Sequence, residues 1–191
     1  MHLHRVMTDI ATHPQYVVGT WALDAAHSEV SFTVRHLAIS KVRGTFEKFD
    51  VTAVTGATPE ESTVEATIDM LSVNTNQADR DKHLRTNDFF NMDEFPTMTF
   101  KSTGITVDGD DFTVAGDLTL RGITKPVKLK GEFGGFITDG YGQQKAGATL
   151  STKINRKDFE VNWNSVIDGA GGLMLGDDVT INLEIALVLQ K

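Results

Sequence analysis

Apolar and polar residues alternate along most of this chain with a period of two, which is typical of half-buried β-strands. The clearest run is residues 179–189, in which Val179, Ile181, Leu183 and every second residue after them are apolar. One longer run, residues 42–54, contains Gly44, which we expect to mark a bend or a bulge. Nine runs show the pattern, which we count as about eight strands: residues 16–23, 29–36, 42–54, 63–73, 98–107, 112–120, 127–136, 144–154 and 179–189.

Residues 79–100 interrupt this alternation. Ala78 to Leu84 are mostly good helix formers, and Asn76 is placed to cap the start of a helix. Pro96 disfavours helix at the residue before it, so the chain leaves this segment extended. We therefore predict a short helix and loop that lie as a lid across one end of the β-structure. The apolar side chains that we expect to turn inward are Leu84, Phe89 and Phe90.

Successive strands joined by short turns predict an antiparallel sheet, and closing such a sheet removes its exposed edges. We therefore predict an all-β, eight-stranded antiparallel barrel with one short inserted helix. Residues 15–191 are expected to form this single domain, and residues 1–14 a flexible N-terminal extension. The interior of an eight-stranded barrel is either filled by side chains or holds one small ligand, so its occupancy decides the function.

Composition and charge restrict the partners of the protein. The formal net charge of −8 and the sequence pI of about 5.1 argue against a nucleic-acid partner, because contacts to phosphates require basic surface. The absence of cysteine excludes disulfides and thiolate metal sites. The first residues lack the apolar core of a secretory signal, and no apolar run is long enough for a transmembrane helix. We therefore expect a cytoplasmic protein.

Motifs of known enzymes are not found in the sequence. It contains no Gly-x-Ser-x-Gly elbow and no phosphate-binding loop. His27 and His36 lie at opposite parities around a predicted strand, so they point to opposite faces and do not suggest a metal site. We predict no catalytic residues, no metal and no cofactor. The alternative is an enzyme that acts on a small hydrophobic substrate, with His83, Asp88 or His36 as acid–base groups.

Four blocks of sequence, in order from Trp21 to the end of the chain, resemble the YceI-like family. They are Trp21-x-x-Asp24-x-x-His27-Ser28 continuing to Gly44-Thr45-Phe46, Asp81-Lys82-His83-Leu84 continuing through Asp88-Phe89-Phe90 to Phe95-Pro96-x-Met98-x-Phe100-x-Ser102, Gly116 to Val127, and Ile154-Asn155-Arg156-x-Asp158-Phe159. The resemblance implies a lipocalin-like barrel and a lipid- or polyisoprenoid-binding protein, and it implies dimers in some relatives.

Small residues recur among the large apolar ones on the faces that we expect to point inward, namely Gly44, Ala66, Gly104, Gly116, Ala146 and Ala148. Such alternation is compatible with a filled core or with a channel, and the resemblance favours a channel. We therefore expect a long isoprenoid ligand, either a polyprenyl lipid or an isoprenoid quinone. The residues predicted to bind it are Phe32, Val34, Phe46, Met70, Leu84, Phe89, Phe90, Met98, Phe100, Leu118 and Trp163.

Two further expectations concern the head group and the assembly. Arg80 and Arg85 are the candidate head-group contacts on the lid, although we expect a neutral head group for which these charges matter little. Ala186 and Val188 interrupt the polar outer face of the last strand, which together with the resemblance suggests a homodimer. A third reading of the chain is a filled barrel that acts only through its surface, as a stress or interaction protein.

Overall fold

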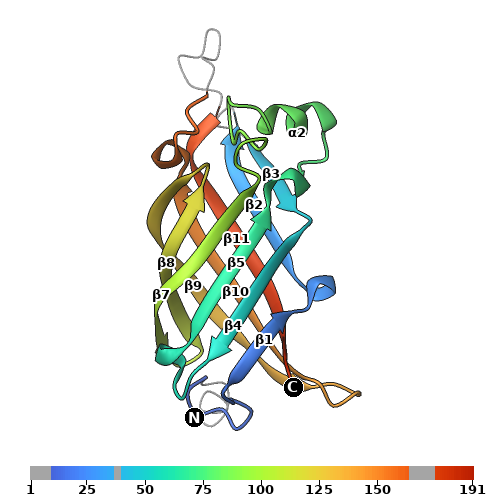
Figure 1. Cartoon of the computed structure of the whole chain (residues 1–191), viewed down its shortest axis with the longest axis vertical. Coiled ribbons are helices and arrows are strands. Elements are labelled where there is room, and N and C mark those ends of the chain that lie inside the picture. Colours follow the sequence, from blue (N-terminus) through green and yellow to red (C-terminus); the bar gives the residue numbers. More distant parts are fainter. Residues whose placement is uncertain (1–9, 37–39, 164–174) are drawn as a thin grey trace.

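The computed structural model describes residues 10–36, 40–163 and 175–191, which form one closed antiparallel β-barrel with a short α-helix at one end (Figure 1). We call the end that carries this helix, α2 (Ala78–Leu84), the upper end, and the C-terminus lies at the lower end. The strands are β1 (Gly19–Leu23), β2 (Glu29–His36), β3 (Ser40–Phe46), β4 (Phe49–Thr55), β5 (Thr63–Asp69), β6 (Val73–Asn74), β7 (Thr97–Asp108), β8 (Asp111–Leu120), β9 (Ile123–Thr138), β10 (Gln144–Asn155) and β11 (Leu175–Leu189). The 3-10 helices are η1 (Ala25–His27), η2 (Pro59–Glu61), η3 (Met70–Ser72) and η4 (Arg156–Phe159).

Eight strand positions close the barrel, which confirms the predicted fold class. At three of these positions, two shorter strands follow one another along the height of the barrel: β1 and β2, β4 and β3, and β5 and β6. Closure depends on β11, because residues 179–184 of this strand pair with β2 and residues 187–189 pair with β1. The long alternating run at the end of the sequence is therefore the strand that seals the barrel.

The predicted bend at Gly44 is wrong. Gly44 lies inside β3, and the chain instead breaks at residues 47–48, between β3 and β4. A Cβ atom at Gly44 would overlap the ring of Phe32, its cross-strand partner. The glycine is thus required by the close approach of an aromatic ring, which packs over the bare backbone of the neighbouring strand.

The same arrangement occurs three times on the inner wall of the barrel: Phe32 over Gly44, Phe100 over Gly116 and Phe112 over Gly131. The expectation that small residues leave open space is therefore wrong at Gly44 and Gly116, because a ring occupies that space. It is also wrong at Gly104, which is exposed. In contrast, Ala66, Ala146 and Ala148 do line an internal cavity.

Residues 75–96, hereafter the lid, cover the upper end between β6 and β7 (Figure 1). The helix occurs at Ala78–Leu84 as predicted, but the predicted cap is wrong, because Asn76 adopts a left-handed backbone with φ of 62°. The side chain of Asp81 reaches back instead and accepts hydrogen bonds from the backbone N–H and the hydroxyl of Thr75, at 2.9 and 2.6 Å.

Arg121 fastens the lid to the rest of the upper end. It lies in the tight β8–β9 turn with Gly122, where both residues have positive φ. Its guanidinium donates hydrogen bonds to the carbonyl oxygens of Phe89 and Glu160 and, at 2.6 Å, to the side-chain oxygen of Asn87. One side chain therefore joins the lid, the β8–β9 turn and the segment after η4.

Residues 10–18 run against the lower end of the barrel. The hydroxyl of Tyr16 donates a hydrogen bond to the carbonyl of Gly56 at 2.8 Å, and the ring of His13 contacts that of Phe136. Residues 1–9 lie outside the described residues, and the domain boundary at residue 14 stays a prediction, as does the dimer through Ala186 and Val188. Within the described ranges, no helix is long and apolar enough to cross a membrane.

Candidate ligand-binding cavity

The barrel encloses two cavities, one above the other. The upper chamber, of about 480 Å³, lies beneath the lid, and the lower chamber, of about 220 Å³, lies between the strands toward the lower end. Among the described residues, Met98 and Ile181 are the two that line both chambers. The two chambers therefore meet at these side chains.

The lower chamber is an apolar space. Of the described residues that line it, none carries a charge, and most are the inward-facing valine, isoleucine, leucine and phenylalanine residues of β4 to β11. Its floor is a group of aromatic rings, in which Phe136 contacts Trp21, Phe133 and His13 with ring centroids 5.8, 4.7 and 4.8 Å apart. Such a chamber favours a hydrocarbon chain over any polar group.

The upper chamber is bounded by three mutually contacting rings. His83 on α2, Phe89 in the lid and Trp163 after η4 have centroids 4.9 to 5.2 Å apart, in tilted and edge-on arrangements that aromatic rings favour. Leu84 and Phe90 line the same chamber from the lid. The predicted inward orientation of the lid's apolar side chains therefore agrees with their positions.

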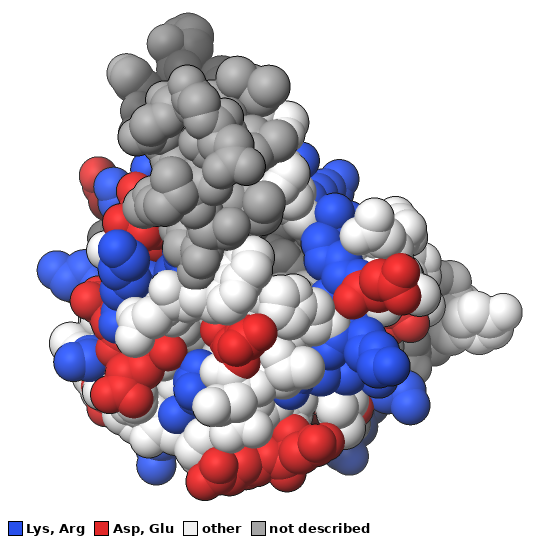
Figure 2. All heavy atoms as spheres, turned by 90° about the horizontal axis from the view of Figure 1, so that it is seen from above, with Lys and Arg blue, Asp and Glu red and all other residues white. Residues whose placement is uncertain are grey.

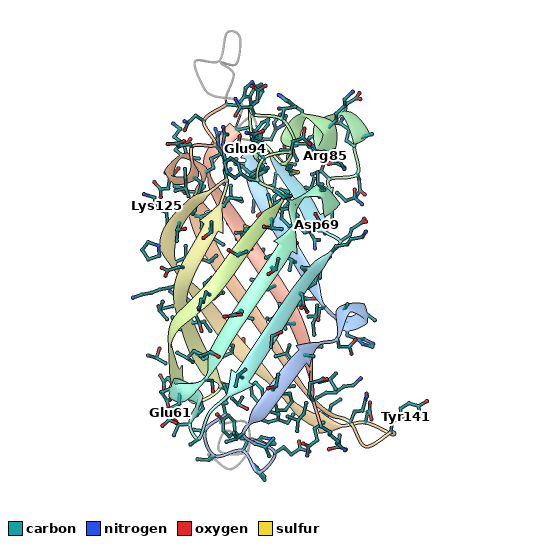
Figure 3. All side chains as sticks on the ribbon, in the orientation of Figure 1. Glu61, Asp69, Arg85, Glu94, Lys125 and Tyr141 are labelled. Carbon is teal, nitrogen blue, oxygen red and sulfur yellow. The ribbon has the colours of Figure 1, made fainter. Side chains whose placement is uncertain are left out.

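Unlike the lower chamber, the upper chamber is also lined by residues with charged side chains. Arg80 is held in place by Thr75, whose hydroxyl and carbonyl accept hydrogen bonds from its guanidinium at 2.8 and 2.7 Å. Arg85 does not line either chamber; it donates a hydrogen bond to the carbonyl of Leu71 at 3.1 Å and lies at the outer surface of the upper end (Figure 3). The structure therefore separates the two arginines that the sequence paired.

Arg156 is an ionisable residue of the upper chamber for which sequence analysis predicted no role, although it lies in one of the motifs noted above. It is 4 % exposed, and its guanidinium donates hydrogen bonds to the carbonyls of Gly176, Val161 and Trp163 at 2.7 to 2.9 Å. Its Nη2 atom lies 3.9 Å from Oδ1 of Asp177 and has no hydrogen-bond partner among the described residues, and the same carboxylate oxygen lies 3.4 Å from Nζ of Lys157.

Burial lowers the pKa of the Arg156 guanidinium from its ordinary value, and the Asp177 carboxylate opposes that change. Arginine nevertheless stays charged, so the chamber contains a buried cation with an acidic neighbour. Arg80 also has an acidic neighbour, Asp81, because the hydroxyl of Thr75 accepts a hydrogen bond from Arg80 and donates one to Asp81. Seen from above, basic and acidic side chains are interspersed over the described part of this face (Figure 2).

Two of the three candidate acid–base groups of the enzyme hypothesis lie together in the lid. His83 Nε2 lies 2.9 Å from Asp88 Oδ2, and both side chains are well exposed, at 40 % and 54 %. His36, the third of these groups, also lines the upper chamber, from β2. In the described part of the chain, no three histidine, cysteine or acidic side chains gather as a metal site would require.

All eleven residues predicted to bind the ligand line one of the two chambers. Phe100 and Leu118 line the lower chamber, Met98 lines both, and the others line the upper chamber: Phe32, Val34, Phe46, Met70, Leu84, Phe89, Phe90 and Trp163. Their contact with a ligand stays a prediction. Sequence reasoning did not include Phe133 and Phe136 among the ligand-binding residues. Strict alternation would place these two on opposite faces, and both line the lower chamber because the pairing of β9 with β10 shifts register between them.

Comparison with known proteins gives consistent matches along most of the chain. Residues 21–187 match the YceI-like domain. Protein YceI of Escherichia coli is 43 % identical over 139 residues, which cover 72 % of this chain and 73 % of that protein. The crystal structure of the Campylobacter jejuni YCEI protein is 32 % identical, with a TM-score of 0.71 over 93 % of this chain and 99 % of that one.

A more distant structure has the same fold. A polyisoprenoid binding domain from Saccharophagus degradans, implicated in plant cell wall breakdown, has a TM-score of 0.64 and 15 % identity, over 91 % of this chain and all of that one. At that identity the likeness concerns the fold alone.

Proposed function

The chain belongs to the YceI-like domain family, and from that premise we propose that it binds the hydrocarbon chain of a long isoprenoid lipid inside its barrel. The ligand is a polyprenyl lipid or an isoprenoid quinone, and the protein sequesters or carries it without chemical change. The observation that carries the proposal is the pair of internal chambers, of about 480 and 220 Å³, in a barrel whose fold is shared with a polyisoprenoid binding domain.

The difference between the chambers sets the orientation of the ligand. The lower chamber offers only apolar or uncharged side chains among its described residues, so it takes the hydrocarbon tail. The upper chamber adds Arg80, His83 and Arg156, which donate hydrogen bonds, so it takes the polar end. A polar group in the lower chamber would lose its water without gaining comparable partners.

The charges around the upper chamber support a neutral polar end. Arg80 and Arg156 each lie near an acidic residue, and Asp79 also lines the chamber, so the two guanidinium groups do not add up to a positive site. A pyrophosphate would need such a site. An uncharged oxygen that accepts a single hydrogen bond does not need a positively charged site.

Apolar burial alone provides enough free energy for binding. Burying ~400 Å² of ligand surface at ~25 cal/mol/Å² contributes on the order of 10 kcal/mol before the costs of association. Groups of aromatic rings border this space at both ends of the barrel.

The test is native mass spectrometry of freshly purified full-length protein, followed by solvent extraction and analysis of the released lipid. We expect a protein-bound mass that is extracted as an intact isoprenoid. Protein that carries no lipid and binds no added prenyl alcohol or quinone would overturn the proposal. An enzyme would instead release a modified product when incubated with the extracted lipid, and a filled barrel would bind none of these compounds.

A further inference from the structure

The two chambers meet at Met98 and Ile181, and the topology explains why these two residues face each other. Around the closed barrel, β7 is the fourth strand and β11 the eighth in the order β1-β4-β5-β7-β8-β9-β10-β11, which closes on β1. Strands four positions apart in an eight-position barrel lie on opposite walls. Met98 on β7 and Ile181 on β11 both point inward, since they are 4 % and 9 % exposed. They therefore narrow the interior from opposite sides.

The two side chains differ in stiffness. Ile181 is β-branched and belongs to the longest continuous pairing of the barrel, so its χ1 angle and its backbone are both restrained. Met98 is unbranched and has three side-chain torsions, and methionine adapts its shape to its surroundings. Next to it on the same face, Phe100 is fixed by its seat over Gly116. Met98 is thus the movable element of the constriction.

We propose that the Met98–Ile181 constriction selects ligands by chain length. A chain short enough for the upper chamber binds without disturbing Met98, whereas a longer chain enters the lower chamber only by turning the Met98 side chain aside. This inference rests on the proposed function, because it concerns the same interior and the same class of ligand. It adds a residue that determines which isoprenoids are held.

The chamber volumes set the length at which the constriction takes effect. A cavity of ~150 Å³ that holds benzene corresponds to ~25 Å³ per carbon atom. On that scale the upper chamber of about 480 Å³ holds about 19 carbons, close to four isoprene units. With the lower chamber of about 220 Å³ added, about 700 Å³ holds about 28 carbons, between five and six units. The change in behaviour therefore falls between chains of about 20 and about 30 carbons.

The experiment compares two prenyl alcohols with the same head group, one of 15 and one of 30 carbons, titrated into delipidated full-length protein. Met98→Ala removes the obstacle, and we expect it to raise the affinity for the longer alcohol about tenfold while changing that for the shorter one less than about twofold. Met98→Phe fills the constriction, and we expect the opposite, a loss of about tenfold for the longer alcohol only.

Met92→Ala is the matched control. Met92 is fully buried, yet it lines neither chamber, so its truncation lowers stability without changing the ratio of the two affinities. Because the readout is a ratio, it does not depend on the fraction of protein that folds. If the ratio of the two affinities were unchanged in both Met98 variants, the constriction would not select ligands by chain length, and the proposed function would remain intact. Wild-type protein that binds neither alcohol would overturn the proposed function itself.

Discussion

The wall of the lower chamber and the cover of the upper chamber are held by different kinds of bond. Around the lower chamber, long strands pair along most of their length, with one register shift in β7 between Ser102 and Gly104, so that most backbone N–H and C=O groups satisfy one another. Around the upper chamber the strands end, and four arginine side chains donate to the carbonyl oxygens that are left: Arg80 to Thr75, Arg85 to Leu71, Arg121 to Phe89 and Glu160, and Arg156 to Gly176, Val161 and Trp163. Buried carbonyls need partners, and the forked guanidinium can serve several at once.

This contrast has a functional consequence. Strand pairing restrains the wall of the lower chamber as a whole, whereas side-chain bonds can be broken one at a time. We therefore expect a ligand to enter and leave at the upper end. The variants below test the contrast in order of expected effect.

The largest effect is expected from Arg156→Leu. It leaves three carbonyl oxygens at the upper end without their donor, which should lower the free energy of unfolding by about 4 kcal/mol. Urea denaturation measures the change. The control is Lys157→Met, the exposed neighbour that pairs with Asp177 at 3.4 Å, for which we expect less than about 0.5 kcal/mol. Equal losses in the two variants would show that the upper end does not depend on the buried arginine.

Gly116→Ala tests the rigidity of the lower wall. The added Cβ would lie 2.5 Å from the Lys101 carbonyl and would overlap the ring of Phe100, so we expect a loss of about 2 kcal/mol in unfolding free energy. Gly104→Ala is a matched control on the neighbouring strand, β7, because an added Cβ atom at Gly104 would meet no atom within 4 Å. If both substitutions were tolerated equally in urea denaturation, the wall would be more pliable than strand pairing implies.

Phe90→Ala tests the lid as the route of release. Phe90 lines the upper chamber and is only partly buried, so we expect about tenfold faster loss of a bound prenyl lipid with only a small decrease in Tm. Phe133→Ala is the corresponding truncation in the lower chamber and should change the release rate less than about threefold. The release rates of the two variants can be measured by following the transfer of a fluorescent prenyl probe to vesicles. If Phe133→Ala released the probe faster than Phe90→Ala, the exit would lie at the lower end.

Acid should weaken the lower end slightly. The hydrogen bond from His27, with help from Lys145, holds the pKa of Asp24 below its ordinary value, and backbone donors and Lys145 do the same for Asp139. Carboxyl groups with a lowered folded-state pKa contribute stability that is present above their unfolded pKa of about 4 and is lost as the pH falls through the folded value. Tm measured from pH 6 to pH 3 should decrease in that range. Lys145→Met should show a smaller decrease; an identical profile would contradict the role of Lys145.

The smallest effect is expected from Arg80→Ala combined with Arg85→Ala. If the polar end of the ligand is neutral, affinity for the co-purified lipid should change less than about threefold. It should also be nearly constant as the screening length shortens from ~10 Å at 0.1 M salt to ~3 Å at 1 M. A steep loss with salt, or in the double variant, would indicate an anionic head group. The single variants then separate Arg80, which lines the upper chamber, from Arg85, which does not.

The sequence alone predicted the parts of this protein that depend on local pattern. Period-two alternation identified most of the strands and much of their inner faces, although residues 42–54 form two strands and residues 63–73 contain a 3-10 helix. Helix propensity with Pro96 identified α2 and the extended exit from the lid. Each of these features is decided by residues close together in the chain. For the strands, the local pattern tells only whether a side chain points into the barrel or out of it.

Alternation does not say what lies across the barrel. The sequence could not show that Phe32 sits over Gly44, because the register of β2 on β3 decides which residue faces the ring. The sequence could not predict the role of Arg156 either. This arginine binds carbonyl oxygens where the pairing between strands ends, and only the folded barrel shows where that is. Nor could the sequence bring Met98 opposite Ile181, since their meeting depends on the closure of the whole sheet by β11. Contacts between distant walls are fixed only when all eight positions are in place.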